Sequence, residues 1–71
     1  MNNITPIINA EAQKYINEFL KKGNSEEESI RLSLDKIKQL KKDYPLVVIF
    51  WEVEKALIEK QIKLRTQNGR I

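Results

Sequence analysis

The sequence contains no cysteine and no histidine. Without cysteine there are no disulfide bonds and no thiolate metal ligands, and without histidine the commonest nitrogen ligand for zinc, copper or iron is missing. A chain of 71 residues builds only a small core, and natural domains of this size often add disulfides, a metal ion or a partner subunit. Of these three ways to stabilise a small domain, we expect association with a partner subunit.

Groups suited to catalysis or ligand binding are also scarce. The only serines are Ser25, Ser29 and Ser33. Ser25 has the position of a helix cap, and we expect Ser29 and Ser33 to lie on solvated helix surface among charged residues. Two isolated glycines cannot form a phosphate loop, and the acidic run at 26–28 lacks the pattern of a calcium loop. We therefore expect no enzyme, no catalytic residue, no cofactor, no metal and no small-molecule substrate.

Long apolar runs are absent as well. No stretch approaches the roughly 18 to 20 apolar residues that span a bilayer, and the N-terminal segment has neither the basic region nor the apolar region of a secretory signal. We expect a cytoplasmic protein without membrane association.

What the chain does contain is a globular composition, with 41% hydrophobic and 32% charged residues. This predicts a single small domain over residues 1–71. The net charge of +3 is unevenly distributed. Residues 1–35 carry four basic and six acidic side chains, for a net charge of −2, whereas residues 36–71 carry nine basic and four acidic ones, for a net charge of +5. Such a dipolar chain is suited to docking on itself or on an acidic partner.

Two helices are predicted in the first 43 residues. Thr5 and Pro6 suit the start of a helix over about 6–22, which Gly23 ends. Ser25 and Glu28 have the spacing of a capping box and predict a second helix over about 26–43. The apolar stripe of this second helix is narrow, and Leu32 lies roughly opposite it. Leu32 is therefore expected to be exposed or to belong to a second contact.

The segment from Leu46 onwards permits two interpretations. As a strand, LVVIFWEV would alternate its apolar residues between two faces and would pair across a dimer. As a helix over about 46–65, it would carry one apolar stripe at Leu46, Phe50, Val53, Leu57 and Leu64 and a second at Val47, Trp51, Ile58 and Ile62. The charged residues that follow are spaced for pairs three and four positions apart, which favours the helix. Residues 66–71 are expected to be a frayed tail.

These elements predict an all-α fold, a three-helix up-down-up bundle with short connections. The third helix then has more apolar surface than its two neighbours can cover. Surplus apolar surface usually marks an interface, so we expect a small protein-protein interaction module. It would be a homodimer through the third helix, and an adaptor or regulator of a larger partner. The candidate interface residues are Val47, Trp51, Ile58, Ile62 and Leu32. Trp51 would be either an interface anchor or a core residue.

Nucleic-acid binding is the alternative function. The basic residues Lys36, Lys38, Lys41 and Lys42, joined by Lys60, Lys63 and Arg65, would supply a patch for phosphates. No aromatic residues are interleaved with them as a base-stacking platform requires. A helix-turn-helix arrangement would direct three glutamates, 26–28, at the phosphates. Both features disfavour this alternative.

Overall fold

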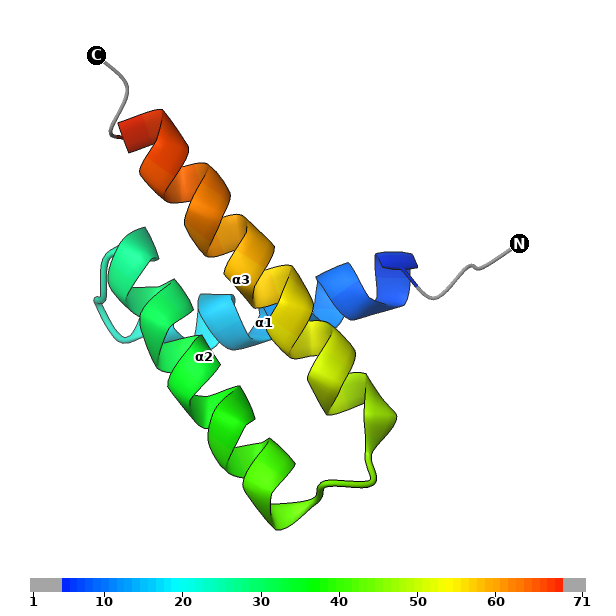
Figure 1. Ribbon diagram of the computed structural model, residues 1–71. Coiled ribbons are helices and arrows are strands. Elements are labelled where there is room, and N and C mark those ends of the chain that lie inside the picture. The colour runs from blue at the N-terminus through cyan, green and yellow to red at the C-terminus, as the bar shows by residue number, and fades with distance from the viewer. Residues whose placement is uncertain (1–4, 69–71) are drawn as a thin grey trace.

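The computed structural model describes residues 5–68, and within this range it contains three helices and no strand. They are α1 (Thr5–Lys21), α2 (Glu26–Asp43) and α3 (Val48–Asn68). α2 and α3 run antiparallel to each other, while α1 lies across the pair and contacts both (Figure 1). The predicted all-α, three-helix bundle is confirmed, with α1 crossing the other two helices at a wide angle (Figure 1).

α1 ends where the sequence indicates, at a glycine with a left-handed backbone. Gly23 has a φ of 96°, which side-chain-bearing residues rarely adopt. Its N–H donates to the carbonyl of Leu20 at 3.0 Å, and the N–H of Asn24 donates to the carbonyl of Phe19 at 3.3 Å. This pair of bonds forms a Schellman motif, which satisfies carbonyls that the helix leaves free. The helix spans 5–21 in place of the predicted 6–22.

α2 has the predicted bounds and the predicted N-cap. The Ser25 hydroxyl accepts a hydrogen bond from the N–H of Glu28 at 3.1 Å. The Glu28 carboxylate pairs with the guanidinium of Arg31 and is thereby drawn along the helix instead of back to the cap. Acidic residues in the first turn and Lys41 and Lys42 in the last turn match the dipole of the helix at both ends.

The start of α3 differs from the expectation. The predicted third helix begins at 46, but Pro45 and Leu46 form a turn in which the N–H of Val47 donates to the carbonyl of Tyr44 at 3.2 Å. Helix begins only at Val48. Leu46, expected in the core stripe, is 92% exposed, because the turn directs it away from the helices. The strand alternative is wrong, since residues 48–53 are helical.

The end of α3 also differs. Residues 66–68, expected to belong to a frayed tail, continue the helix to Asn68. The remaining tail residues, 69–71, lie outside the described range. The longer helix places Leu64 well inside the element, where it packs against the core.

The core lies where the three helices meet. Its buried members come from all of them: Ile8, Ala12, Ile16, Ile30, Leu34, Ile37, Val53, Ala56 and Leu57. Tyr15, Leu40, Phe50 and Leu64 pack around this cluster. The core stripe predicted for the third helix is therefore present from Phe50 onwards.

Two serines of α2 correct the expectation of a solvated surface. Ser29 and Ser33 are completely buried. Together with Lys36 they occupy positions i, i+4 and i+7 and so share a helix face. The Nζ of Lys36 lies 3.3 Å from a carboxylate oxygen of Glu18 on α1, which shows that this face is turned towards α1. Side chains as small as serine suit a face on which α1 and α2 contact each other.

Candidate protein interface on the third helix

α3 has apolar residues on two nearly opposite faces. Val53 and Leu57 are buried in the core. Ile58 and Ile62 follow them by five positions each, which at about 100° per residue places them roughly 140° round the helix. Trp51 and Val48 fall on the same outward side. We call Val48, Trp51, Ile58 and Ile62 the outer stripe of α3.

The outer stripe is exposed along its whole length. Val48 is 70%, Trp51 47% and Ile62 57% exposed, and Ile58 is also exposed. Trp51 is therefore not a core residue. Val47 directly precedes the helix and is 38% exposed. The structure thus brings three of the five predicted interface residues, Trp51, Ile58 and Ile62, together on one side of α3, and Val47 is exposed just before its first residue.

Leu32 is the predicted interface residue that lies elsewhere. It is on α2, partly buried and outside the core cluster. Lys41, whose side chain reaches α3, is nine positions further on, which places it roughly 180° round the helix from Leu32. Leu32 therefore faces away from α3 and does not extend the outer stripe.

Trp51 is held in place by two polar groups. Its indole Nε1–H donates to the carbonyl of Pro45 at 3.1 Å, which ties the ring to the turn before α3. The Nζ of Lys41 lies 3.8 Å from the centre of the ring, a distance that favours a cation–π interaction. The same ammonium group pairs with Glu54 at 2.5 Å, and both charged side chains are mostly buried. The exposed ring therefore has a fixed orientation in the free chain.

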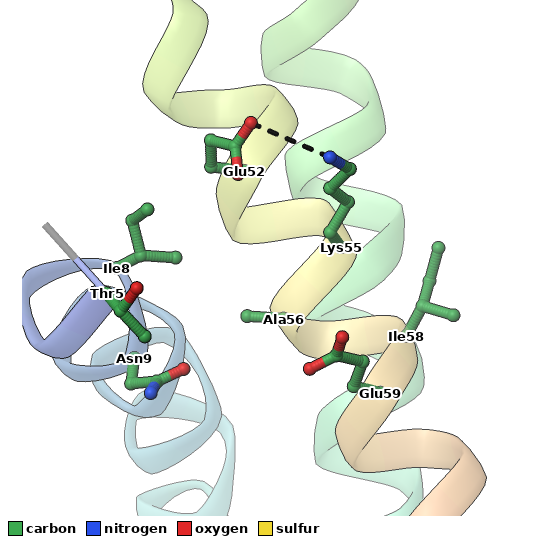
Figure 2. Close-up of a pocket in the computed structure, with 8 residues that line it drawn as sticks. All are labelled: Thr5, Ile8, Asn9, Glu52, Lys55, Ala56, Ile58 and Glu59. Atoms are coloured by element: carbon green, nitrogen blue, oxygen red, sulfur yellow. Dashed lines mark ion pairs between the residues drawn. The ribbon is translucent and has the colours of Figure 1, made fainter. Parts of the chain in front are cut away.

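An open groove runs beside the outer stripe, between α3 and the start of α1. It has a volume of about 460 Å³ and is lined from α1 by Thr5, Ile8 and Asn9, and from α3 by Glu52, Lys55, Ala56, Ile58 and Glu59. Figure 2 shows Ala56 pointing towards α1 and Ile58 on the other side of α3. Lys55 and Glu52 pair weakly across one turn, at 3.8 Å. The groove thus combines an apolar floor with two carboxylates and one ammonium group.

The basic residues considered for nucleic acid are divided between two ends of the molecule. Lys60 and Lys63 line a surface depression with Glu26 and Ile30, at the start of α2. Lys41 lies in the last turn of α2, at the opposite end of that helix. Lys60 and Lys63 lie beside its first turn because α3 runs antiparallel to α2 (Figure 1). Lys41 and Lys36 are also engaged with Glu54 and Glu18. The arrangement gives no single basic patch from these two groups.

Val48 and Lys55 are members of this surface that the sequence reasoning missed. Val48, Lys55 and Ile62 are spaced seven residues apart, and Trp51 and Ile58 are also seven apart. A seven-residue repeat with these offsets is the pattern by which one helix packs along another. Searching the predicted third helix for this repeat, in addition to its core stripe, would have identified both residues.

Two further properties concern residues 5–68. No group of three or more metal-ligating side chains is assembled in this range. None of its helices combines the length and apolar character that crossing a bilayer demands.

Comparisons with protein-family models, with curated proteins and with solved structures give no match to this chain.

Proposed function

We propose that this chain is a small protein-protein interaction module that forms a homodimer through the outer stripe of α3 and serves, in that form, as an adaptor or regulator of a larger partner. The observation that carries the proposal is the outer stripe itself. Four large apolar side chains lie on one helix face, away from the core, and are exposed. Fully burying a side chain of this kind contributes about 1.5 to 3 kcal/mol relative to leaving it exposed.

The fixed orientation of Trp51 supports the proposal. Tryptophan is enriched among the residues that dominate binding energy, and a ring already held by Pro45 and Lys41 loses little conformational freedom when a partner covers it. Lys41 and Glu54 satisfy each other in the free chain, so association leaves no new buried charge at this end of the stripe. Trp51 is accordingly the expected anchor.

The length of the outer stripe indicates how strongly two copies should associate. From Val48 to Ile62 it extends for roughly 21 Å, at about 1.5 Å per residue. Contacts along one such helix lie near the small end of specific interfaces, below about 1,200 Å² of total buried surface. We therefore expect a weak dimer that dissociates on dilution within the micromolar range.

Sedimentation equilibrium over a range of concentrations tests this proposal. The unmodified chain is expected to approach twice its monomer mass of 8.4 kDa as concentration rises. Ile62→Glu places a charge in the stripe and should leave a monomer. Ile7→Glu is a matched control, because Ile7 on α1 is 59% exposed and Ile62 57%. An acidic residue in the first turn of α1 also suits the helix dipole, so this variant should dimerise normally.

Trp51 is the only tryptophan, so its fluorescence reports on the same interface. Its emission maximum should move to longer wavelength on dilution, as the ring is returned to water. A monomer at all concentrations, or equal loss of dimer in the Ile7→Glu and Ile62→Glu variants, would contradict the proposal.

A further inference from the structure

The outer stripe has a repeat that can pair with itself in one antiparallel register. Val48, Trp51, Lys55, Ile58, Ile62 and Arg65 follow alternating steps of three and four residues, the spacing of a helix-packing seam. In a two-fold symmetric dimer the same surface is used by both copies. One antiparallel register places every member of the seam opposite another member. It matches Trp51 with Ile62, Lys55 with Ile58, and Val48 with Arg65 of the second copy.

Lys55 is the one charged residue in the middle of this seam, between Trp51 and Ile58. Its ammonium group is only weakly engaged, at 3.8 Å from Glu52, and its side chain is 73% exposed. An ammonium group set among apolar residues in an interface requires a carboxylate nearby, because an unpaired buried charge is costly. Glu52 gives Lys55 only this long ion pair, so a carboxylate from the second copy at this point would stabilise the closed seam.

Glu59 is the carboxylate that lies in the required position. It lines the groove between α1 and α3, one turn after Lys55, and makes no ion pair within residues 5–68. In the antiparallel register Lys55 lies opposite Ile58 of the second copy, and Glu59 is the next residue along. The groove is open to solvent and its volume of about 460 Å³ has room for the end of a lysine side chain.

We infer that Lys55 of each copy enters the groove of the other and pairs with Glu59 there, so that two reciprocal ion pairs set an antiparallel register of α3 against α3. The inference rests on the proposed function and names the geometry of that same surface. The charge gradient of the helix agrees with it. Residues 48–57 contain Glu52, Glu54 and Lys55, whereas residues 58–68 contain Glu59, Lys60, Lys63 and Arg65. Antiparallel pairing places Glu52 beside the basic residues late in α3 of the other copy, whereas Glu54 takes no part because it is paired with Lys41 of α2.

Charge reversal separates a pair between copies from a pair within one helix. Lys55→Glu and Glu59→Lys are each expected to weaken the dimer about tenfold, because each variant replaces two weak attractions by two repulsions. In an equimolar mixture, the Lys55→Glu copy has a carboxylate at both positions of the pair, and the Glu59→Lys copy has an ammonium group at both. Both contacts between these copies are attractive, so a heterodimer should form with about the affinity of the unmodified chain.

The mixture is read by sedimentation equilibrium at low salt, with far-UV circular dichroism to verify that each variant is folded. Lys55 and Glu59 are both exposed, so both variants should fold. Charge repulsion inside each variant's own helix is the same in the mixture as alone, and recovery therefore reports contacts between copies. If the unmodified chain dimerises but the mixture stays as monomeric as its components, the register is wrong and the proposed function stands. If the unmodified chain is itself a monomer, both fail.

Discussion

α2 and α3 differ in which side chains are buried and which are exposed. α2 buries the hydroxyls of Ser29 and Ser33 completely, whereas α3 leaves Trp51 and Ile62 about half exposed. Polarity alone would predict the reverse. The difference follows from what lies opposite each face. The serines are buried on the face of α2 that is turned towards α1, and the outer stripe of α3 faces no element of residues 5–68.

The largest expected effect is on stability, and it separates the buried face of α3 from its exposed face. Leu57→Ala removes a fully buried side chain and should lower the free energy of unfolding by about 2 to 5 kcal/mol. A core of this size contributes only about 3 to 5 kcal/mol, so this variant should be largely unfolded. Ile58→Ala, one position later and 40% exposed, should cost less than about 1 kcal/mol in the monomer. Urea denaturation followed by far-UV circular dichroism measures both.

Protein concentration separates the two faces further. The cost of Ile58→Ala should increase at concentrations where the dimer forms, because the dimer stabilises the folded chain by mass action. The cost of Leu57→Ala should remain large at every concentration. Similar losses for the two variants in dilute solution would mean that Ile58 also belongs to the monomer core, and the contrast between the faces would disappear.

The sequence predicted the elements whose signals are local. Ser25 with Glu28, and Gly23, specify the start of α2 and the end of α1 through bonds within a few residues, and both are present. The start of α3 was missed by two residues because Pro45 is compatible with both a first helical position and a turn. In the observed turn the indole N–H of Trp51 donates to the Pro45 carbonyl. The sequence contains no signal for this hydrogen bond.

Burial was predicted where hydrophobic periodicity decides it and missed where packing decides it. Val53 and Leu57 were assigned to the core from spacing alone, and both are fully buried. Ser29 and Ser33 were assigned to the surface because their neighbours along the chain are charged. Their burial depends on the closeness of α1, a tertiary property that spacing along α2 does not contain. For the candidate interface, spacing grouped Trp51, Ile58 and Ile62 correctly on one side of α3.

An intermediate effect is expected when the small side chains facing α1 are enlarged. Ser29→Leu inserts a large side chain where α1 lies against α2 and should lower stability by about 1 to 3 kcal/mol. The same change at exposed Lys38 should have little effect, although leucine is apolar in both cases. Thermal unfolding of the two variants gives the comparison. Equal tolerance of leucine at both positions would contradict close packing at Ser29.

Alanine at position 29 separates the effect of side-chain size from the effect of hydrogen bonding by the hydroxyl. The Ser29 hydroxyl has no hydrogen-bond partner within residues 5–68, so Ser29→Ala should leave stability unchanged or raise it by up to about 1 kcal/mol. The Ser33 hydroxyl donates to the carbonyl of Ser29 at 2.7 Å, so Ser33→Ala should be the less favourable of the two changes. A large loss in Ser29→Ala would show that its hydroxyl has a structural role.

The smallest effect concerns the outer face of α2, which is charged where the outer face of α3 is apolar. Arg31 pairs with Glu28 and, at 3.4 Å, with Asp35. The hydrogen bond from Arg31, aided by its positive charge, lowers the pKa of Glu28 below its ordinary value of 4.5. The ionised form of Glu28 therefore stabilises the folded chain above about pH 4.5, and this stabilisation is lost as the pH falls through the lowered pKa.

Arg31→Gln should raise the pKa of Glu28 back towards its ordinary value, as measured by an NMR titration of the Glu28 side-chain carboxyl. Arg31→Lys is the control, since it keeps the charge and loses the two-pronged geometry of the guanidinium; it should give an intermediate pKa. The stability difference between the unmodified chain and Arg31→Gln should be present at neutral pH and vanish in acid. Because the pair is exposed, solvent screening keeps this difference small, and dimer formation should not change. An altered dimer in Arg31→Gln would mean that α2 contributes to the interface along with α3.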